Sequence, residues 1–278
     1  MSEEREPAKA LQMVELHFAG AAPDLDAVPE RLRELLRVEP EAIEVDETDR
    51  SLLLYHRSHP VDSQGRMPAQ TAILSAEGAS NPERYAAELQ QSWACPDAET
   101  RLKASTHTCL LTEMLSAVLP TAVRLELFHA ALQSLVEITS PIALVFKHSQ
   151  QVLDPAVYLA ACAEPPARRP GVVNVRFFRV ENADGTLIMD TRGLEEIGLH
   201  DLQCRFRGLE PDAVSRVLFS TAIYIVENGP VIESGHSIQG LTEDSRWRCQ
   251  FEEALLDPPR TLLDLHPGDE HAAASQST

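Results

Sequence analysis

The proline-rich segment Ala163–Gly171, which reads AEPPARRPG, constrains the fold of this chain more than any other feature. Proline lacks a backbone N–H and has a fixed φ, so three prolines this close together exclude a regular strand or helix. We therefore expect the chain to divide here into an N-terminal domain, residues 11–163, and a C-terminal domain, residues 172–266. Residues 1–10 and 268–278 are polar or small, and we expect both to be flexible tails.

Strand-like and helix-like runs alternate in the N-terminal domain. Alternating apolar and polar residues predict a strand, and apolar residues three and four positions apart predict a helix. The wholly apolar run Ile142–Phe146 indicates a strand buried on both faces. The other predicted elements are strands at Leu11–Phe18, Ile43–Val45, Ser51–His56, Thr71–Ser75 and Thr106–Leu111, and helices at Asp24–Arg37, Asn81–Trp93, Pro120–Ile138 and Asp154–Ala163.

The same patterns continue in the C-terminal domain, with more turns. They predict strands at Val172–Val180, Thr186–Asp190, Leu202–Phe206, Val231–Ile232 and Leu262–Leu265, a further segment at Trp247–Leu256, a turn at Asn182–Gly185, and helices at Leu194–Ile197 and Pro211–Glu227. Mixed strands and helices without a strict βα repeat predict an α+β fold of two mixed layers, each a sheet packed with helices. Because both domains begin with a strand and later carry a long helix, a duplicated small α/β sandwich is an alternative.

The chain is strongly acidic throughout. Its 278 residues carry a formal net charge of −19. Residues 1–170 hold 15 Lys or Arg against 25 Asp or Glu, and residues 171–278 hold 9 against 18. Such a surface repels nucleic acids and anionic membranes, so we expect neither as a partner. A basic protein is the partner class that this charge favours. The sequence leaves the oligomeric state open.

Several chemistries lack their sequence motifs. The five cysteines form no C-x-x-C pair, and no phosphate-binding, dinucleotide-binding or H-E-x-x-H motif occurs. We therefore expect no metal site and no cofactor, and we assign no catalytic residue. The segment Gly235–Gly240 is one residue too long for a nucleophile elbow and is interpreted as a turn. The charged N-terminus and the absence of a long apolar run favour a cytoplasmic protein with reduced thiols.

One polar cluster stands between well-defined elements. It comprises Asp190, Thr191, Arg192, Glu195, His200, Asp201 and Cys204. In one interpretation these side chains form a binding surface, or a catalytic or metal site in which Arg192 clamps an anion and His200 transfers protons. In the other, Asp190 caps the short helix, Arg192 pairs with a neighbouring carboxylate, and Cys204 lies in the core. The enzyme interpretation requires His200 within hydrogen-bond reach of a carboxylate in a shared pocket.

Two smaller features each allow two interpretations. His56 and His59, with His107 further along, are metal-ligand types, but they follow a strand and precede Pro60, which favours loop residues. Trp247 is either an exposed interface anchor or a core residue. Our candidate binding residues are therefore Asp190, Arg192, Glu195, His200, Asp201 and Trp247.

A string of short motifs in the second half of the chain resembles a known family. The motifs are Asn174-Val175-Arg176 with Phe177, Asp190–Leu194, Gly198–Cys204, the helix end at Tyr224–Gly229, Gly235, Gly240 and Pro259-Arg260. Over roughly residues 140–265 the chain is similar to the bacterial domain of unknown function 4261. Because that family has no established activity or catalytic residues, the resemblance implies a domain and transfers no function.

Acidity and the missing catalytic motifs together favour a non-enzymatic intracellular protein that binds another macromolecule. An immunity protein or a secretion-associated accessory protein fits this description. The alternative is a small-ligand sensor or a hydrolase that uses Asp190, Arg192 and His200.

Overall fold

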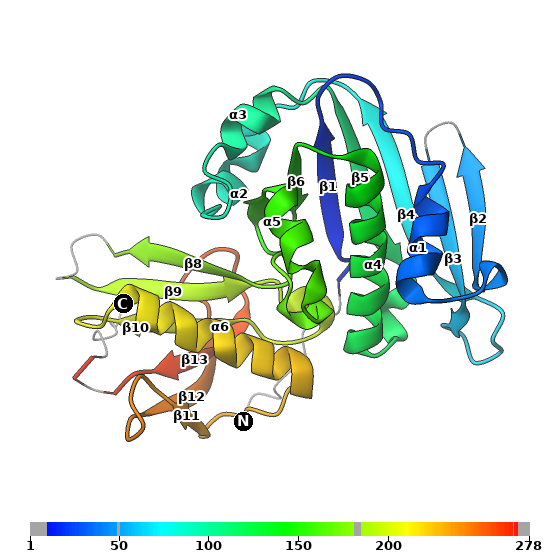
Figure 1. Ribbon diagram of the computed structural model, residues 1–278. Helices are drawn as coiled ribbons and strands as arrows, with labels where there is room; N and C mark the ends of the chain where they lie inside the picture. The colour runs from blue at the N-terminus through cyan, green and yellow to red at the C-terminus, as the bar shows by residue number, and fades with distance from the viewer. Residues whose placement is uncertain (1–9, 49–50, 181–184, 269, 272–278) are drawn as a thin grey trace. The chain divides into compact units, whose positions relative to one another are not determined.

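The computed structural model describes residues 10–48, 51–180, 185–268, 270 and 271. The predicted turn at Asn182–Gly185 and the two predicted tails lie almost entirely outside these residues. The chain forms two compact units, which meet in the sequence between Val172 and Val173. We call them the N-terminal unit and the C-terminal unit and describe each by itself (Figure 1).

The N-terminal unit is built on a seven-stranded sheet in the order β2-β3-β4-β5-β1-β6-β7. Every neighbouring pair in this sheet is antiparallel. Its strands are β1 (Met13–Phe18), β2 (Ile43–Thr48), β3 (Ser51–Pro60), β4 (Pro68–Glu77), β5 (His107–Met114), β6 (Ala143–Phe146) and β7 (Gln151–Leu153). Strand β6 is buried at every residue, which confirms the prediction for this apolar run.

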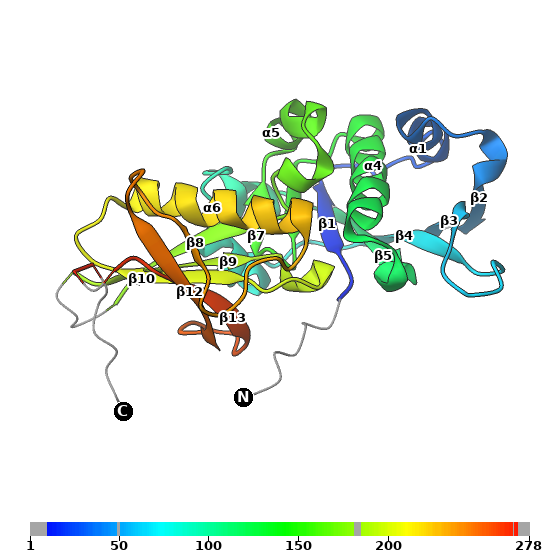
Figure 2. The ribbon, with the colours of Figure 1, turned by 90° about the horizontal axis from the view of Figure 1, so that it is seen from below.

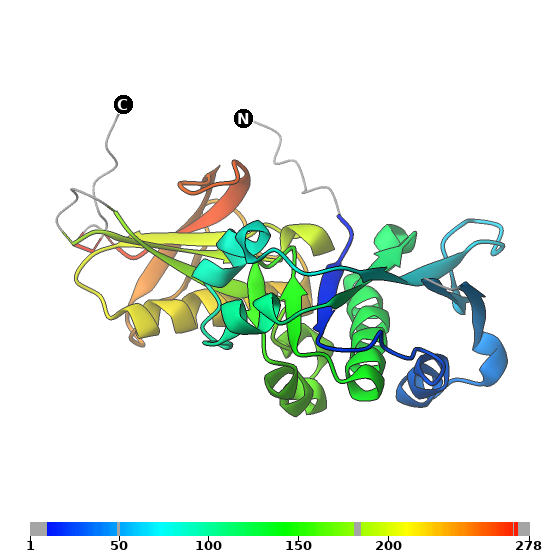
Figure 3. The ribbon, with the colours of Figure 1, turned by 90° about the horizontal axis from the view of Figure 1, so that it is seen from above.

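Helices cover both faces of this sheet. They are α1 (Val28–Leu36), α2 (Ala86–Gln90), α3 (Ala98–Lys103), α4 (Thr121–Thr139) and α5 (Pro155–Ala160). Helices α1 and α4 lie side by side (Figure 3) and pack their apolar residues against Leu16, Leu54 and Phe146 in the main core. Alternate residues of β6, Ala143 and Val145, belong to a second core with Leu102 of α3. Side chains of a strand point alternately to opposite faces, so β6 contributes to both layers.

The C-terminal unit is built on a six-stranded mixed sheet in the order β11-β12-β13-β10-β9-β8. Its strands are β8 (Asn174–Arg179), β9 (Leu187–Arg192), β10 (Leu202–Phe206), β11 (Ser237–Gln239), β12 (Arg246–Glu253) and β13 (Thr261–His266). Strands β10 and β13 are parallel and the other neighbours antiparallel. The two units are thus α+β, as predicted, but their sheets differ in strand order and direction and are not copies of one topology.

Helix α6 (Pro211–Asn228) crosses one face of the C-terminal sheet (Figure 2). The helix ends at Gly229, whose φ of 82° favours glycine. The registers place apolar side chains on the face shared by Met189, Cys204 and Leu263. They place Arg176, Asp190 and Gln203 together on the opposite face. One face of this sheet is therefore apolar and the other carries the polar cluster.

One predicted helix is interrupted and one predicted strand is absent. The predicted helix Asn81–Trp93 is helical over residues 82–90 but consists of a 3-10 turn, Pro82–Tyr85, followed by the short α2, because Tyr85 leaves helical geometry at φ −114° and ψ 23° and packs its ring into the core. The predicted strand Val231–Ile232 does not form, and the strand of this region is β11, within the segment interpreted as a turn. Gly229 and Pro230 direct the chain away from the sheet just before Val231, which is 45% exposed.

Among the described helices, none has the length and apolar character needed to cross a bilayer.

Candidate functional site

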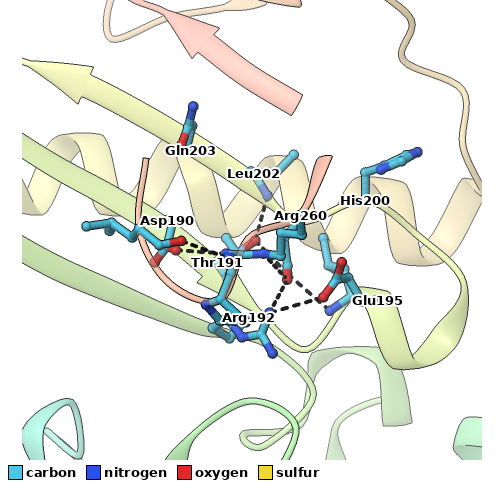
Figure 4. A network of polar contacts seen from close by, with 12 residues as sticks. Asp190, Thr191, Arg192, Glu195, His200, Leu202, Gln203 and Arg260 are labelled. Atoms are coloured by element: carbon cyan, nitrogen blue, oxygen red, sulfur yellow. Dashed lines mark hydrogen bonds and ion pairs between the residues drawn. The ribbon is translucent and has the colours of Figure 1, made fainter. Parts of the chain in front are cut away.

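The polar cluster lies where β9 ends and β10 begins in the sheet of the C-terminal unit. In β9, Asp190 and Arg192 share a face because side chains alternate along a strand. The register puts Asp190 between Arg176 of β8 and Gln203 of β10. A 3-10 turn, Glu195–Ile197, then returns the chain through Gly198 toward Asp201. Local strand geometry and this tight turn bring the cluster together (Figure 4).

Asp190 is held by two arginines. Arg176 donates from Nε to Oδ1 at 2.8 Å and from Nη2 to Oδ2 at 2.5 Å, and Arg260 donates from Nη2 to Oδ2 at 2.8 Å. The Asp190 side chain is buried, with 1% of its surface exposed. A buried carboxylate needs such charge-assisted bonds to offset the loss of water. Asp190 therefore joins β8, β9 and the segment that carries Arg260.

Asp201, not Asp190, binds the backbone at the start of the 3-10 turn. Its Oδ1 accepts hydrogen bonds from Thr191 Oγ1 at 3.0 Å and from the backbone N–H of Leu194 at 3.2 Å. Thr191 Oγ1 in turn accepts from the N–H of Leu202 at 2.8 Å. The interpretation of Asp190 as the cap is wrong because its carboxylate is taken up by arginines, whereas Asp201 reaches back to the start of the turn.

Two guanidinium groups also lie against Asp201. Arg192 Nη1 and Arg260 Nε are each 3.4 Å from Oδ2. Burial raises the pKa of Asp201 to about 7, and the charges of Arg192 and Arg260 act in the opposite direction. Burial likewise raises the pKa of the nearby Glu196. The carboxyl groups of Asp201 and Glu196 are thus buried and not presented to solvent.

Arg192 pairs with carboxylates, as one of our interpretations expects. Its Nη1 donates to Glu195 Oε2 at 3.1 Å in addition to its contact with Asp201. Glu195 is the most exposed carboxylate of the group, with about a quarter of its side chain accessible. Cys204 is fully buried, in agreement with the core interpretation. Asp190, Arg192, Glu195 and Asp201 therefore form one network.

His200 and Trp247 lie outside that network. His200 Nδ1 is 3.1 Å from the carbonyl oxygen of Thr261, and its ring centroid is 4.7 Å from that of Phe251. Among the described residues, no carboxylate forms a hydrogen bond or ion pair with His200. Trp247 is 2% exposed, so the interpretation of an exposed interface anchor is wrong and the core interpretation holds.

The sequence interpretation missed Arg176 and Arg260 as members of the site. Arg260 also donates from Nη1 to the carbonyl of Pro258 at 3.0 Å and from Nη2 to that of Thr191 at 3.2 Å. Arg176 donates from Nη2 to the carbonyl of Asp257 at 3.1 Å. These bonds fasten the segment before β13 over the polar face. Two signals could have found them: both arginines belong to the motifs of the family resemblance, and an arginine within the β8 strand pattern needs a partner if it faces the sheet.

The N-terminal histidines do not form a metal site. His56 lies in β3, not in a loop, and its Nε2 is 2.9 Å from Thr71 Oγ1. Strand β3 continues to Pro60, so His56 is a strand residue and not the loop residue that we predicted. His107 Nδ1 is 3.0 Å from Thr106 Oγ1. In the part of the chain that the structure describes, no group of three or more His, Cys, Asp or Glu side chains could hold a metal ion.

A second polar group in the N-terminal unit was not predicted. His17 Nδ1 is 3.1 Å from Ser105 Oγ, and His17 Nε2 is 3.8 Å from Glu15 Oε2. Tyr85 donates its hydroxyl to the same Glu15 oxygen at 2.6 Å. The residue types are those of a nucleophile, base and acid, but Ser105 is buried and donates to the carbonyl of His107. Without access for a substrate, this group stabilises the sheet.

Comparison with known proteins gives a match to a family model that covers most of the polar network. Residues 190–266 match the family model described as domain of unknown function (DUF4261). The match starts at Asp190 and includes Asp201 and Arg260, but it does not extend back toward residue 140. No curated protein and no solved structure matches the chain. The segment 190–266, which holds the network apart from Arg176, is therefore similar to the DUF4261 family.

Proposed function

We propose that this protein acts by binding another protein and not by catalysis. The observation that carries the proposal is the closure of the polar network. Asp190 and Asp201 are buried, and arginines of the same unit occupy their oxygens. A catalytic acid or base must reach a substrate atom directly or through one water molecule. Residues that pair with one another inside the unit stabilise its fold. Recognition of a partner is then a task of the surface of the unit.

Charge supports a basic partner. The net charge of −19 speeds association with a positively charged protein and slows association with acidic ones. An immunity protein or a secretion-associated accessory protein is a role of this kind. The proposal keeps the cytoplasm as its compartment, in which the five cysteines, none in a disulfide among the described residues, remain thiols.

The geometry favours this proposal over a sensor or hydrolase that uses Asp190, Arg192 and His200. Such an enzyme needs His200 beside a carboxylate, whereas His200 Nδ1 faces the carbonyl of Thr261. Arg192 would have to bind an anionic group, but Glu195 and Asp201 already neutralise it. A ligand would therefore have to displace two internal carboxylates.

Affinity purification of the tagged full-length chain from its native host tests the proposal. We expect a specific protein to copurify at low salt and to be lost as salt rises, since surface charges are screened beyond about 8 Å at physiological ionic strength. The partner is then purified separately and the complex rebuilt from the two components. Failure to recover a partner at any salt concentration contradicts the proposal. Loss of a measurable hydrolytic activity in an Arg192→Gln variant that remains folded would favour the enzyme instead.

A further inference from the structure

Strand β11 leaves one side of its backbone unpaired. It lies at the edge of the C-terminal sheet and pairs with β12 alone. The carbonyl of His236 accepts from Cys249 N–H at 2.8 Å, and Gly240 N–H donates to the carbonyl of Ser245 at 3.0 Å. Hydrogen-bonding direction alternates along an antiparallel strand, so the intervening Ser237 and Gln239 turn their N–H and C=O groups outward. Within the described residues, these outward groups have no partner.

A groove runs beside this free edge. Its cavity volume is about 860 Å³, and it lies between β11 and the C-terminal half of α6. It is lined by Ser220 and Tyr224 of α6, by Val231 and Ile232, and by Ile238 of β11. Tyr224 is 51% exposed. The groove therefore combines free backbone groups with an apolar and hydroxyl-bearing wall, the two components that strand-addition sites use.

The edge is held in a fixed shape. Ile238 is opposite the buried Trp247 in the register. A Cβ at Gly240 would lie 2.4 Å from Trp247 Nε1, so only glycine allows the chain to leave β11 this close to the indole. Gly235, at φ 89°, makes the turn that starts the strand. A preformed edge lowers the entropy cost of adding a strand.

Charge at one end of the groove selects the occupant. The C-terminal end of a helix carries a partial negative charge, and α6 ends beside this groove. Among the described residues, those that line the cavity include no Lys, Arg, Asp or Glu. Glu233 follows Ile232 of the lining directly, its side chain is 70% exposed, and its Oε2 is 4.0 Å from Nε2 of His236. These charges favour a cationic side chain beside the start of β11.

We propose that the groove between α6 and β11 binds an extended segment of a partner protein, which adds to the sheet as a strand on β11. The segment places an apolar side chain against Tyr224, Val231 and Ile238 and a Lys or Arg beside Glu233. Its backbone pairs with the free N–H and C=O groups of Ser237 and Gln239. This inference rests on the proposed protein-binding function and identifies where and how the partner is recognised.

The experiment begins with a random peptide library displayed on phage and selected against the full-length chain. We expect selected peptides to alternate apolar and polar residues and to carry a Lys or Arg at one end. Ser237→Pro removes an outward N–H that the β11–β12 ladder does not use, and edge strands tolerate proline at such positions. We expect it to weaken the selected peptides about tenfold or more.

Two further variants separate recognition from folding. Tyr224→Ser removes the aromatic wall without touching the strand, and we expect a similar loss of peptide affinity. Glu253→Ser changes the far end of β12, a position outside the groove lining, and should leave the affinity unchanged. Circular dichroism checks that each variant folds. Peptides that bind wild type, Ser237→Pro and Tyr224→Ser equally would overturn the proposal.

Two other outcomes distinguish the groove from the wider function. If a partner recovered from the host binds Ser237→Pro as well as wild type, the groove assignment fails while protein binding stands. If no partner is recovered but Ser237→Pro still weakens the binding of the selected peptides, the proposed protein-binding function loses its support. The groove then remains a site for extended peptides. Light scattering that finds a dimer abolished by Ser237→Pro would instead make a second copy of the chain the occupant and overturn the partner assignment.

Discussion

The two units bury ionisable side chains in opposite ways. The N-terminal unit buries neutral histidines and gives them hydroxyl partners, as with His56 and Thr71 or His129 and Tyr158. The C-terminal unit buries carboxylates and surrounds them with arginines, as at Asp190 and Asp201. The N-terminal unit also contains a closed ion pair, Arg124 with Glu113.

This difference matters because a neutral pair and a charged network depend differently on pH and on the loss of a partner. A buried histidine avoids the desolvation cost by staying uncharged. A buried carboxylate network offsets that cost with several mutually dependent contacts, so removal of one member exposes the others. The C-terminal unit should therefore respond more sharply to single substitutions.

The largest expected effect is that of Arg260→Ala. Arg260 contacts both Asp190 and Asp201, so its loss leaves two buried carboxylates short of a partner. We expect the free energy of unfolding of the C-terminal unit to fall by about 3 kcal/mol. Denaturant titration in a Trp93→Phe background measures it, because the other tryptophan, Trp247, is buried in this unit. A loss no greater than that of Arg101→Ala, whose ion pairs are half-exposed and whose effect on the N-terminal unit is followed by hydrogen exchange, would remove the distinction between the units.

Acidification should change the stability of the two units in opposite directions. Burial raises the pKa of Asp201 to about 7, and burial with Glu252 raises that of Asp264 to about 7, both from an ordinary 3.8. Their folded forms bind more protons than the unfolded chain, so this stability is complete below about pH 4 and is lost as pH rises through 7. Burial lowers the pKa of His56 to about 4 and that of His129 to about 3. Their contribution is present above pH 6.5 and is lost as pH falls.

Between pH 7 and pH 5 the C-terminal unit should therefore gain stability and the N-terminal unit should lose it. The expected slope is at most about 1.4 kcal/mol per pH unit for each group. Hydrogen exchange read by mass spectrometry resolves β3 and β4 from β9 and β10 in one experiment. Asp201→Asn should remove the part of this response that Asp201 contributes, leave the part that Asp264 contributes, and not change the response of the N-terminal unit. If the stability of both units changed in the same direction, this would refute the assignment of carboxyls with raised pKa values to one unit and histidines with lowered pKa values to the other.

A pair of hydroxyl deletions, one in each unit, gives a smaller effect. Thr191→Val removes the hydrogen bond to the Asp201 carboxylate and the one that Thr191 accepts from the N–H of Leu202, and Thr71→Val removes one to the neutral His56. Bonds to charged groups contribute about 1.5–3 kcal/mol, and those between neutral groups about 0.5–1.5 kcal/mol. We expect Thr191→Val to be the more destabilising of the two in thermal unfolding at a pH well above 7, where Asp201 is ionised. Equal losses would mean that Asp201 is not ionised in the folded protein.

The smallest effect is expected from His200→Ala. His200 contacts the Thr261 carbonyl and the Phe251 ring but belongs to no buried pair. Its removal should change the free energy of unfolding by about 0.5 kcal/mol or less. It should also leave affinity for a recovered partner unchanged. A large loss of stability or of partner affinity would show that His200 belongs to the functional site and would support the enzyme alternative.

The sequence by itself determined most of the local elements. Leu202–Phe206 forms a strand with the predicted bounds, and Pro211–Glu227 forms a helix that ends at the Asn228-Gly229 pair. Apolar periodicity and glycine geometry act within a few residues, so they can be recognised along the chain. The same holds for the strand at Ile142–Phe146, whose apolar run required cover on both faces.

Only the tertiary structure decided which polar groups meet. Asp190 binds Arg260, seventy positions away in the sequence, whereas the local pattern suggested a helix cap. Trp247 is buried behind the edge strand, and β11 formed where glycines indicated a turn. A buried charge takes whichever partner the fold brings within hydrogen-bond distance, and that distance is set by strand register and loop return. Periodicity shows that a polar residue lies on a face, but it carries no information about what lies across from it.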